Sequence, residues 1–112
     1  MNQQDPAVAL RLREAISQLI FVGFNSRAAA LDRDTGEIVW SWTSPHGTSS
    51  YVALLLDGDR LVVSVQGYTY CLNPLNGEQI WFNAFEGFGY GLPTMVSVNG
   101  SSTTSSTSPE ER

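Results

Sequence analysis

The chain has 112 residues, of which 42% are hydrophobic and 11% aromatic, and its net charge is −5 at pH 7. This length accommodates one small domain, and this composition indicates a packed core rather than a disordered chain. All six basic residues are arginines, set against eleven acids, so we expect no basic patch for nucleic acid or anionic membrane. The single cysteine, Cys71, excludes an intramolecular disulfide.

The sequence shows neither a secretory signal nor an apolar run of about 18 residues, the length that a membrane-spanning helix needs. We therefore expect a cytoplasmic protein without a membrane span.

The first predicted element is an amphipathic helix within residues 1–20. Asp5 can cap its first turn, and Pro6 suits the first helical position because its missing N–H costs nothing there. The apolar residues recur at helical spacing; they are Val8, Leu12, Ile16 and Leu19. We expect this helix to pack on its own chain, and the alternative is docking on a neighbouring helix or a separate protein.

Residues 21–98 are predicted to form β-strands, because short β-branched or aliphatic runs alternate with turn signals. A hairpin signal, Asp57-Gly58-Asp59, joins two of these runs. The expected strands cover residues 20–24, 27–32, 37–42, 51–56, 60–66, 68–73, 79–82 and 92–98. Residues 99–112 (NGSSTTSSTSPEER) contain no apolar side chain and are predicted to be a disordered Ser/Thr-rich tail.

A repeat runs through the predicted strands. The stretch AALDRDTGEIVW at residues 29–40 returns 41 residues later as YCLNPLNGEQIW at residues 70–81. A blade of a β-propeller takes roughly 40–45 residues, so the spacing predicts two blades, at about residues 21–61 and 62–98. Glycine suits the tight turn in each repeat, and tryptophan can fill the space between adjacent blades. The structural positions of the repeat pair Leu31 with Leu72, Gly36 with Gly77, Glu37 with Glu78 and Trp40 with Trp81.

The pattern L-[DN]-x-x-[TN]-G-E-x-[VI]-W resembles the repeat of the quinoprotein-like propellers (PQQ-repeat blades). That family includes quinone-cofactor alcohol dehydrogenases and the scaffold lipoprotein of outer-membrane assembly. The resemblance implies that Trp40 and Trp81 are buried against a neighbouring blade. The chain departs from the family in having about two blades instead of eight, no vicinal cysteine pair, and no acidic and amide set suited to a calcium-bound quinone. We therefore expect no cofactor.

The predicted fold is mainly β, with two four-stranded antiparallel propeller-like blades and one N-terminal α-helix. Blade one has three strands before residue 44, while residues 92–98 supply a surplus strand at the end. If this strand completes blade one of the next chain, head-to-tail association closes a homo-oligomeric ring, a trimer or a tetramer. The alternative is a monomeric α+β domain in which the helix covers the open edge of the sheet.

Aromatic residues gather in the connectors at one end of the predicted meander, beside glycines that let a ligand approach the backbone. The alternative is that the aromatic rings of residues 84–91 pack a subunit boundary, and that the histidine is a solvated loop residue. The candidate ligand-binding face consists of His46, Tyr51, Tyr68, Phe88 and Tyr90.

No motif places a catalytic nucleophile, and Cys71 lies mid-strand, where burial is expected. Asp32, Asp34 and Glu37 lack the remaining ligands of a calcium loop, and Asp32 and Thr35 fit turn chemistry, so we expect no metal site. The leading hypothesis is a non-catalytic, self-assembling scaffold that presents its loop face to a small ligand or a protein partner. The alternatives are an enzyme with a subunit-boundary site around His46 and Glu86, or a degenerate fragment of a larger quinoprotein-like propeller.

Overall fold

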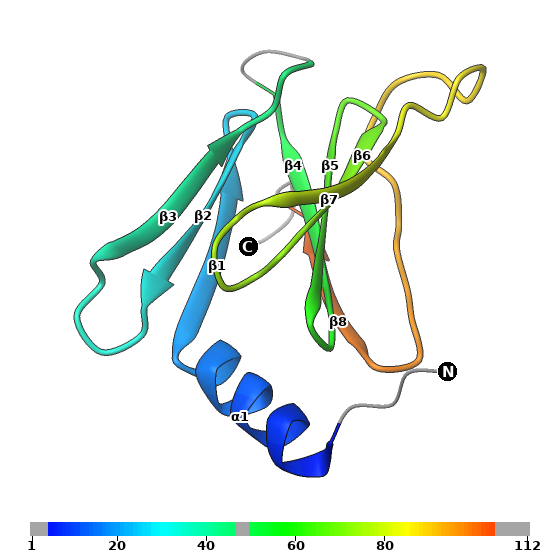
Figure 1. Ribbon diagram of the computed structural model, residues 1–112. Helices are drawn as coiled ribbons and strands as arrows, with labels where there is room; N and C mark the ends of the chain where they lie inside the picture. The colour runs from blue at the N-terminus through cyan, green and yellow to red at the C-terminus, as the bar shows by residue number, and fades with distance from the viewer. Residues whose placement is uncertain (1–4, 47–49, 105–112) are drawn as a thin grey trace, which may run out of the picture.

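A computed structural model describes residues 5–46 and 50–104 of the chain, and it consists of one helix and two antiparallel sheets. The three-stranded sheet, blade one, has the order β1-β2-β3, and the five-stranded sheet, blade two, has the order β7-β6-β5-β4-β8. The two sheets stand face to face, with α1 beneath one end (Figure 1). The mainly β fold with propeller-like blades is confirmed. No helix within the described ranges is long and apolar enough to cross a membrane.

The helix α1 spans Pro6–Ser17, and it begins as predicted: the Asp5 side chain accepts a hydrogen bond from Ala7 N at 3.0 Å. Only Ile16 is buried along it, at 7% exposure, while Val8 is 38% exposed. Leu19 already belongs to the first strand. The apolar stripe is therefore buried at its C-terminal end alone.

The strands of blade one lie where the sequence predicted them, and no strand end is shifted by more than one residue. They are β1 (Leu19–Phe24), β2 (Arg27–Asp32) and β3 (Ile38–Thr43). In blade two, β4 (Val52–Asp57) and β5 (Arg60–Val65) form the predicted hairpin, with Gly58 at a φ of 58°. The meander continues through β6 (Tyr68–Leu72) and β7 (Gln79–Asn83).

The end of the chain differs from the prediction. Residues 92–98 do not form a strand; Pro93 lacks a backbone donor there. Instead β8 (Gly100–Thr104) pairs antiparallel with β4, from Asp57↔Gly100 to Ala53↔Thr104. The prediction of disorder is therefore wrong for these five residues, because backbone hydrogen bonds to an open strand edge require no apolar side chain. Residues 105–112 lie outside the described part.

The strand pairing also corrects the prediction of four strands in each blade. Blade one has three strands, and blade two has the expected four with β8 added at the β4 edge. Residues 92–98 do not form the strand that, in the predicted ring, completes blade one of another chain.

The core lies between the two sheets. One cluster joins small residues of β2 to aliphatic residues of β4, β5 and β6, and Leu19, Phe21 and Trp42 pack against it. Gly23 marks the closest approach, because a Cβ there would come within 2.6 Å of Val52 Cγ1. The buried members of the cluster are Ala28, Ala30, Trp40, Val52, Leu54, Leu61, Val63, Val65, Tyr70 and Leu72.

Candidate functional site

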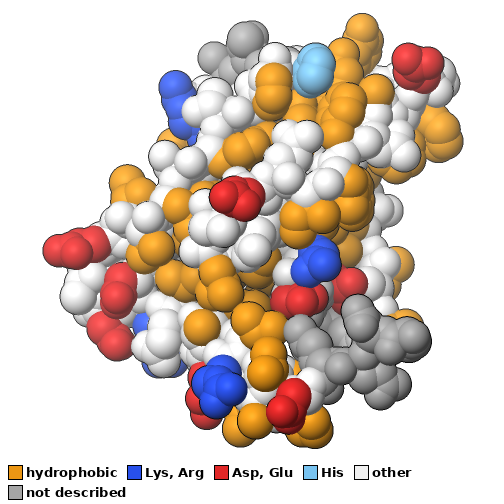
Figure 2. Space-filling view, in the orientation of Figure 1, with side chains coloured by type: hydrophobic (Ala, Val, Ile, Leu, Met, Phe, Trp, Pro, Cys, Tyr) orange, Lys and Arg blue, Asp and Glu red, His pale blue; other side chains and the backbone are white. Residues whose placement is uncertain are grey.

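The candidate site occupies the loop end of the two sheets, opposite α1 (Figure 1). Two tight turns lie there, and Asn25, Ser26 and Gln66 all adopt positive φ, between 53° and 61°. Each of these turns joins two consecutive strands of one blade. The connectors 44–50 and 84–91 begin at the same end of the sheets. The histidine lies at this end, surrounded by hydrophobic side chains in the space-filling view (Figure 2).

His46 is exposed, yet it is not a freely solvated loop side chain. Its ring stacks on Tyr68, with ring centroids 4.6 Å apart, and on Phe82, with centroids 5.2 Å apart and an interplanar angle of 9°. The connector after blade one is thus tied to β6 and β7 of blade two. Stacking of this kind fixes the ring plane.

A polar network holds the same loop from below. The Tyr70 hydroxyl lies 2.9 Å from His46 Nδ1 and 3.0 Å from Ser44 Oγ, which also donates to the His46 carbonyl. Burial raises the pKa of the Tyr70 phenol, against an opposing effect of its hydrogen bond to Ser44. Tyr70 therefore remains a neutral phenol that positions His46.

Two neighbouring pockets lie at this end of blade two, and the first of them borders the stack through Tyr68. One has a volume of about 480 Å³, and its lining includes Tyr68, Glu86 and Tyr90. The other, of about 410 Å³, lies between Thr69 and the segment 85–95, and both Phe88 and Tyr90 line it. Phe88 and Tyr90 are 79% and 87% exposed, so their rings are free to cover a bound molecule.

The structure brings together four of the five predicted site residues. His46 stacks on Tyr68, which shares a pocket with Tyr90, and Tyr90 shares the second pocket with Phe88. Tyr51, which directly precedes β4 and is 68% exposed, lines neither of these two pockets. The alternative in which residues 84–91 pack a subunit boundary stays a prediction.

Sequence reasoning missed Ser44, Tyr70 and Phe82. A signal for Tyr70 was present, since it follows Tyr68 at the strand period of two and so points to the same face of the sheet. Phe82 pairs with Tyr70 across the β6–β7 ladder, and that register could not be counted reliably because a bulge follows at Leu72.

The site combines aromatic rings with the imidazole of His46 and the carboxylate of Glu86. Among the described residues, His46 and Glu86 are connected only through Tyr68. Tyr68 stacks on His46 and lines the same pocket as Glu86. Within residues 5–46 and 50–104, no group of three His, Cys, Asp or Glu side chains is placed to hold a metal ion. Cys71 is fully buried, and burial raises the pKa of its thiol.

Trp40, Leu72 and the two glycine turns have the structural roles expected of the repeat, whereas Trp81 is 46% exposed, so the burial that the resemblance implied for Trp81 is not found in this chain. The Trp40 indole Nε1–H donates to the Pro74 carbonyl at 2.8 Å, and its ring lies on Gly77, where a Cβ would come within 2.5 Å of it. Leu72 is fully buried. The backbone carbonyls of Glu37 and Glu78 close equivalent turns, accepting from Asp32 N and Asn73 N at 2.8 Å each. The turn chemistry predicted for Asp32 is confirmed, since its carboxylate accepts from Asp34 N and Thr35 N.

A comparison with protein families decides where this repeat belongs. The profile of the outer membrane protein assembly factor BamB matches residues 25–99, two thirds of the chain. The chain belongs to this family. The resemblance to PQQ-repeat propellers predicted from the repeat is thereby confirmed.

The matched region of the BamB family covers most of both blades. Among solved structures, the chain is similar to BamB from Moraxella catarrhalis, with 23% identity over 61% of this chain and a TM-score of 0.44. The chain spans about a fifth of the length of that protein, 20% of it being covered. Among curated proteins, none matches the chain.

Proposed function

We propose that this chain is a non-catalytic protein-interaction module of the BamB family, which binds an extended segment of a partner at its loop face. The observation that carries the proposal is the pair of adjoining pockets at the loop end of blade two, one of them bordering the His46 stack, with Tyr90 shared between them. The exposed rings of Phe88 and Tyr90 provide large contact area at low entropic cost, as in other binding surfaces.

Glycines in the same connector support this choice of ligand. Gly87, Gly89 and Gly91 adopt positive φ, and a Cβ on any of them would meet no atom within 4 Å. Backbone amides and carbonyls are therefore accessible next to apolar rings, and a peptide can use both. The family takes its name from an outer membrane protein assembly factor, a role that also concerns the handling of other proteins.

Self-association belongs to the same proposal. Two blades leave sheet faces uncovered, and head-to-tail association of several copies, a trimer or a tetramer, would cover them and repeat the loop face around a ring. The cytoplasmic location stays a prediction.

The test is selection of binders from a random peptide library displayed on phage, followed by affinity measurement with purified protein. We expect selected peptides to bind Tyr90→Ala at least roughly tenfold more weakly than the unmodified chain. Tyr51→Ala is the matched control, because it removes the same exposed ring outside both pockets. Selection of no binder, or equal binding to both variants, would contradict the proposal.

A further inference from the structure

The contact between the two blades has a knob and a socket. Trp40 of β3 is the knob, and the turn after β6 is the socket, because Pro74 offers its carbonyl and Gly77 offers a surface without a side chain. Trp40 is 8% exposed in this position. Only glycine permits the fit, since a Cβ would come within 2.5 Å of the indole ring.

The repeat supplies a second knob, on the outside of blade two. Trp81 of β7 lies 41 residues after Trp40 and is 46% exposed. It pairs with Cys71 in the ladder and therefore points away from blade one, whereas its neighbour Phe82 contacts Tyr70 on the side of blade one. The segment 85–95 lines the pocket over Thr69 on the outer side, and it leaves Trp81 exposed.

A second socket lies on blade one. Gly36 is the counterpart of Gly77, and a Cβ placed on it would meet no atom within 4 Å of the described chain. Arg33 is the counterpart of Pro74, so its carbonyl is the expected acceptor for an indole N–H. Gly36 has a φ of 77° and Gly77 a φ of 78°, which shows that the two turns share one backbone form.

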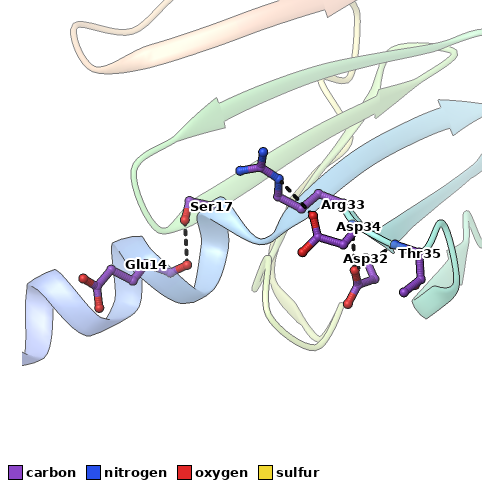
Figure 3. Close-up of polar contacts among 6 residues, drawn as sticks. All are labelled: Glu14, Ser17, Asp32, Arg33, Asp34 and Thr35. Carbon is purple, nitrogen blue, oxygen red and sulfur yellow. Dashed lines mark hydrogen bonds and ion pairs between the residues drawn. The ribbon is translucent and has the colours of Figure 1, made fainter.

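The socket on blade one is already formed. Asp32 Oδ1 accepts from Asp34 N at 2.8 Å and Thr35 N at 3.2 Å, and Arg33 pairs with Asp34 at 3.8 Å (Figure 3). Asn73 Oδ1 accepts from Leu75 N in the same way beside the occupied socket. Arg33 N is held by the Gln18 carbonyl at 2.9 Å, which ties the turn to the end of α1. Docking there requires little ordering of the chain, and such preorganisation favours binding.

The sheet face around the free socket is apolar. Ile20 and Ile38 are 51% and 67% exposed on the side of blade one that faces away from blade two. The residue equivalent to Ile20 in blade two is Leu61, which is 1% exposed because it faces blade one. The same face is thus a buried blade interface in one repeat and an open surface in the other.

From these two halves we infer that a second copy of this chain docks head to tail, with its Trp81 seated on Gly36 and its indole N–H donating to the Arg33 carbonyl. The occupant is a second copy because the chain carries both halves of a contact that it already makes once internally. The inference rests on the self-association in the proposed function, and it names the two halves of the contact, the exposed Trp81 and the turn at Gly36; no strand is exchanged. Each contact leaves another knob and socket free, so the association is heterologous.

The experiment is a complementation of two variants by native mass spectrometry over a dilution series. Trp81→Ala removes the knob, and Ile20→Asp places a charge beside the socket. We expect each variant alone to be monomeric at concentrations where the unmodified chain is oligomeric, with dissociation constants raised at least roughly tenfold. An equimolar mixture should form a heterodimer that grows no further, because it retains one intact knob and one intact socket.

The outcomes separate this inference from the loop-face proposal. A monomeric unmodified chain, an oligomeric Trp81→Ala variant, or a mixture without heterodimer would overturn the docking. Circular dichroism checks that both variants fold, and Ile38→Asp replaces Ile20→Asp if that variant does not. Tyr90→Ala should assemble like the unmodified chain, while Trp81→Ala should bind selected peptides with unchanged affinity. If only Tyr90→Ala loses peptide binding and the unmodified chain does not assemble, the loop-face proposal is supported and the docking is rejected.

Discussion

The two blades use the same turn and the same tryptophan, but the two tryptophans have different surroundings. Trp40 lies in the core with 8% of its surface exposed, whereas Trp81 is 46% exposed. Their glycine partners differ in the same way, since Gly77 touches an indole ring and Gly36 touches nothing within 4 Å. The comparison teaches that the repeat encodes one local structure, while the presence of a neighbour decides whether that structure becomes core or surface.

The largest expected difference concerns the tryptophans themselves. Trp40→Ala should lower the free energy of unfolding by about 3–5 kcal/mol, because it leaves a cavity and an unpaired Pro74 carbonyl between the blades. Trp81→Ala should cost about 1 kcal/mol or less in the dissociated chain. Urea denaturation at the lowest workable protein concentration measures both. Equal losses would mean that Trp81 is also a core residue of the single chain.

Equivalent aliphatic residues provide the second comparison. Leu61→Ala should cost about 2–5 kcal/mol, since Leu61 is 1% exposed between the sheets. Ile20→Ala, at the equivalent position of blade one, should cost less than about 1 kcal/mol because the side chain is half exposed. Thermal or urea unfolding of the pair is the measurement, and a costly Ile20→Ala would show that blade one is covered on its outer face.

The glycines give a smaller difference. Gly36→Ala should cost about 1–2 kcal/mol, the penalty of positive φ for a residue with a Cβ. Gly77→Ala carries that penalty and adds about 1–3 kcal/mol for overlap with Trp40. In a Trp40→Ala background, Gly77→Ala should cost only the positive-φ penalty, because the overlap with the indole ring is gone. An overlap penalty that persists in a double-mutant cycle would contradict the knob-and-socket account.

The smallest expected effect is a pH dependence confined to blade two. Burial raises the pKa of Cys71 above its ordinary 9.0, so the folded state keeps the proton that the unfolded state loses. The stabilising contribution is complete below the unfolded pKa and is lost as pH rises through the folded pKa. Stability should therefore fall above about pH 9. Cys71→Ala, which copies Ala30 of blade one, should reduce that loss in unfolding experiments between neutral and alkaline pH.

Much of the site could be predicted as a location but not as a set of contacts. Consecutive turns of a meander lie alternately at its two ends, and this alternation places His46, Tyr68 and Tyr90 at one end of the sheets. The stacking of His46 on Phe82 depends on how the connector after blade one crosses to blade two. That path is a tertiary property, because the residues involved are 36 positions apart in the sequence.

The sequence by itself determined the helix, the first seven strands, their turns and the family, because these depend on local chemistry: the Asp5 cap, the glycines at positive φ, and the spacing of 41 residues between the two repeats. Tertiary structure decided what each element meets. It placed β8 on the open edge of β4, although polar composition had suggested no structure there, and it buried Trp40 while leaving Trp81 exposed. Local propensity is a property of neighbouring residues, whereas burial depends on which surface of the folded chain arrives to cover a side chain.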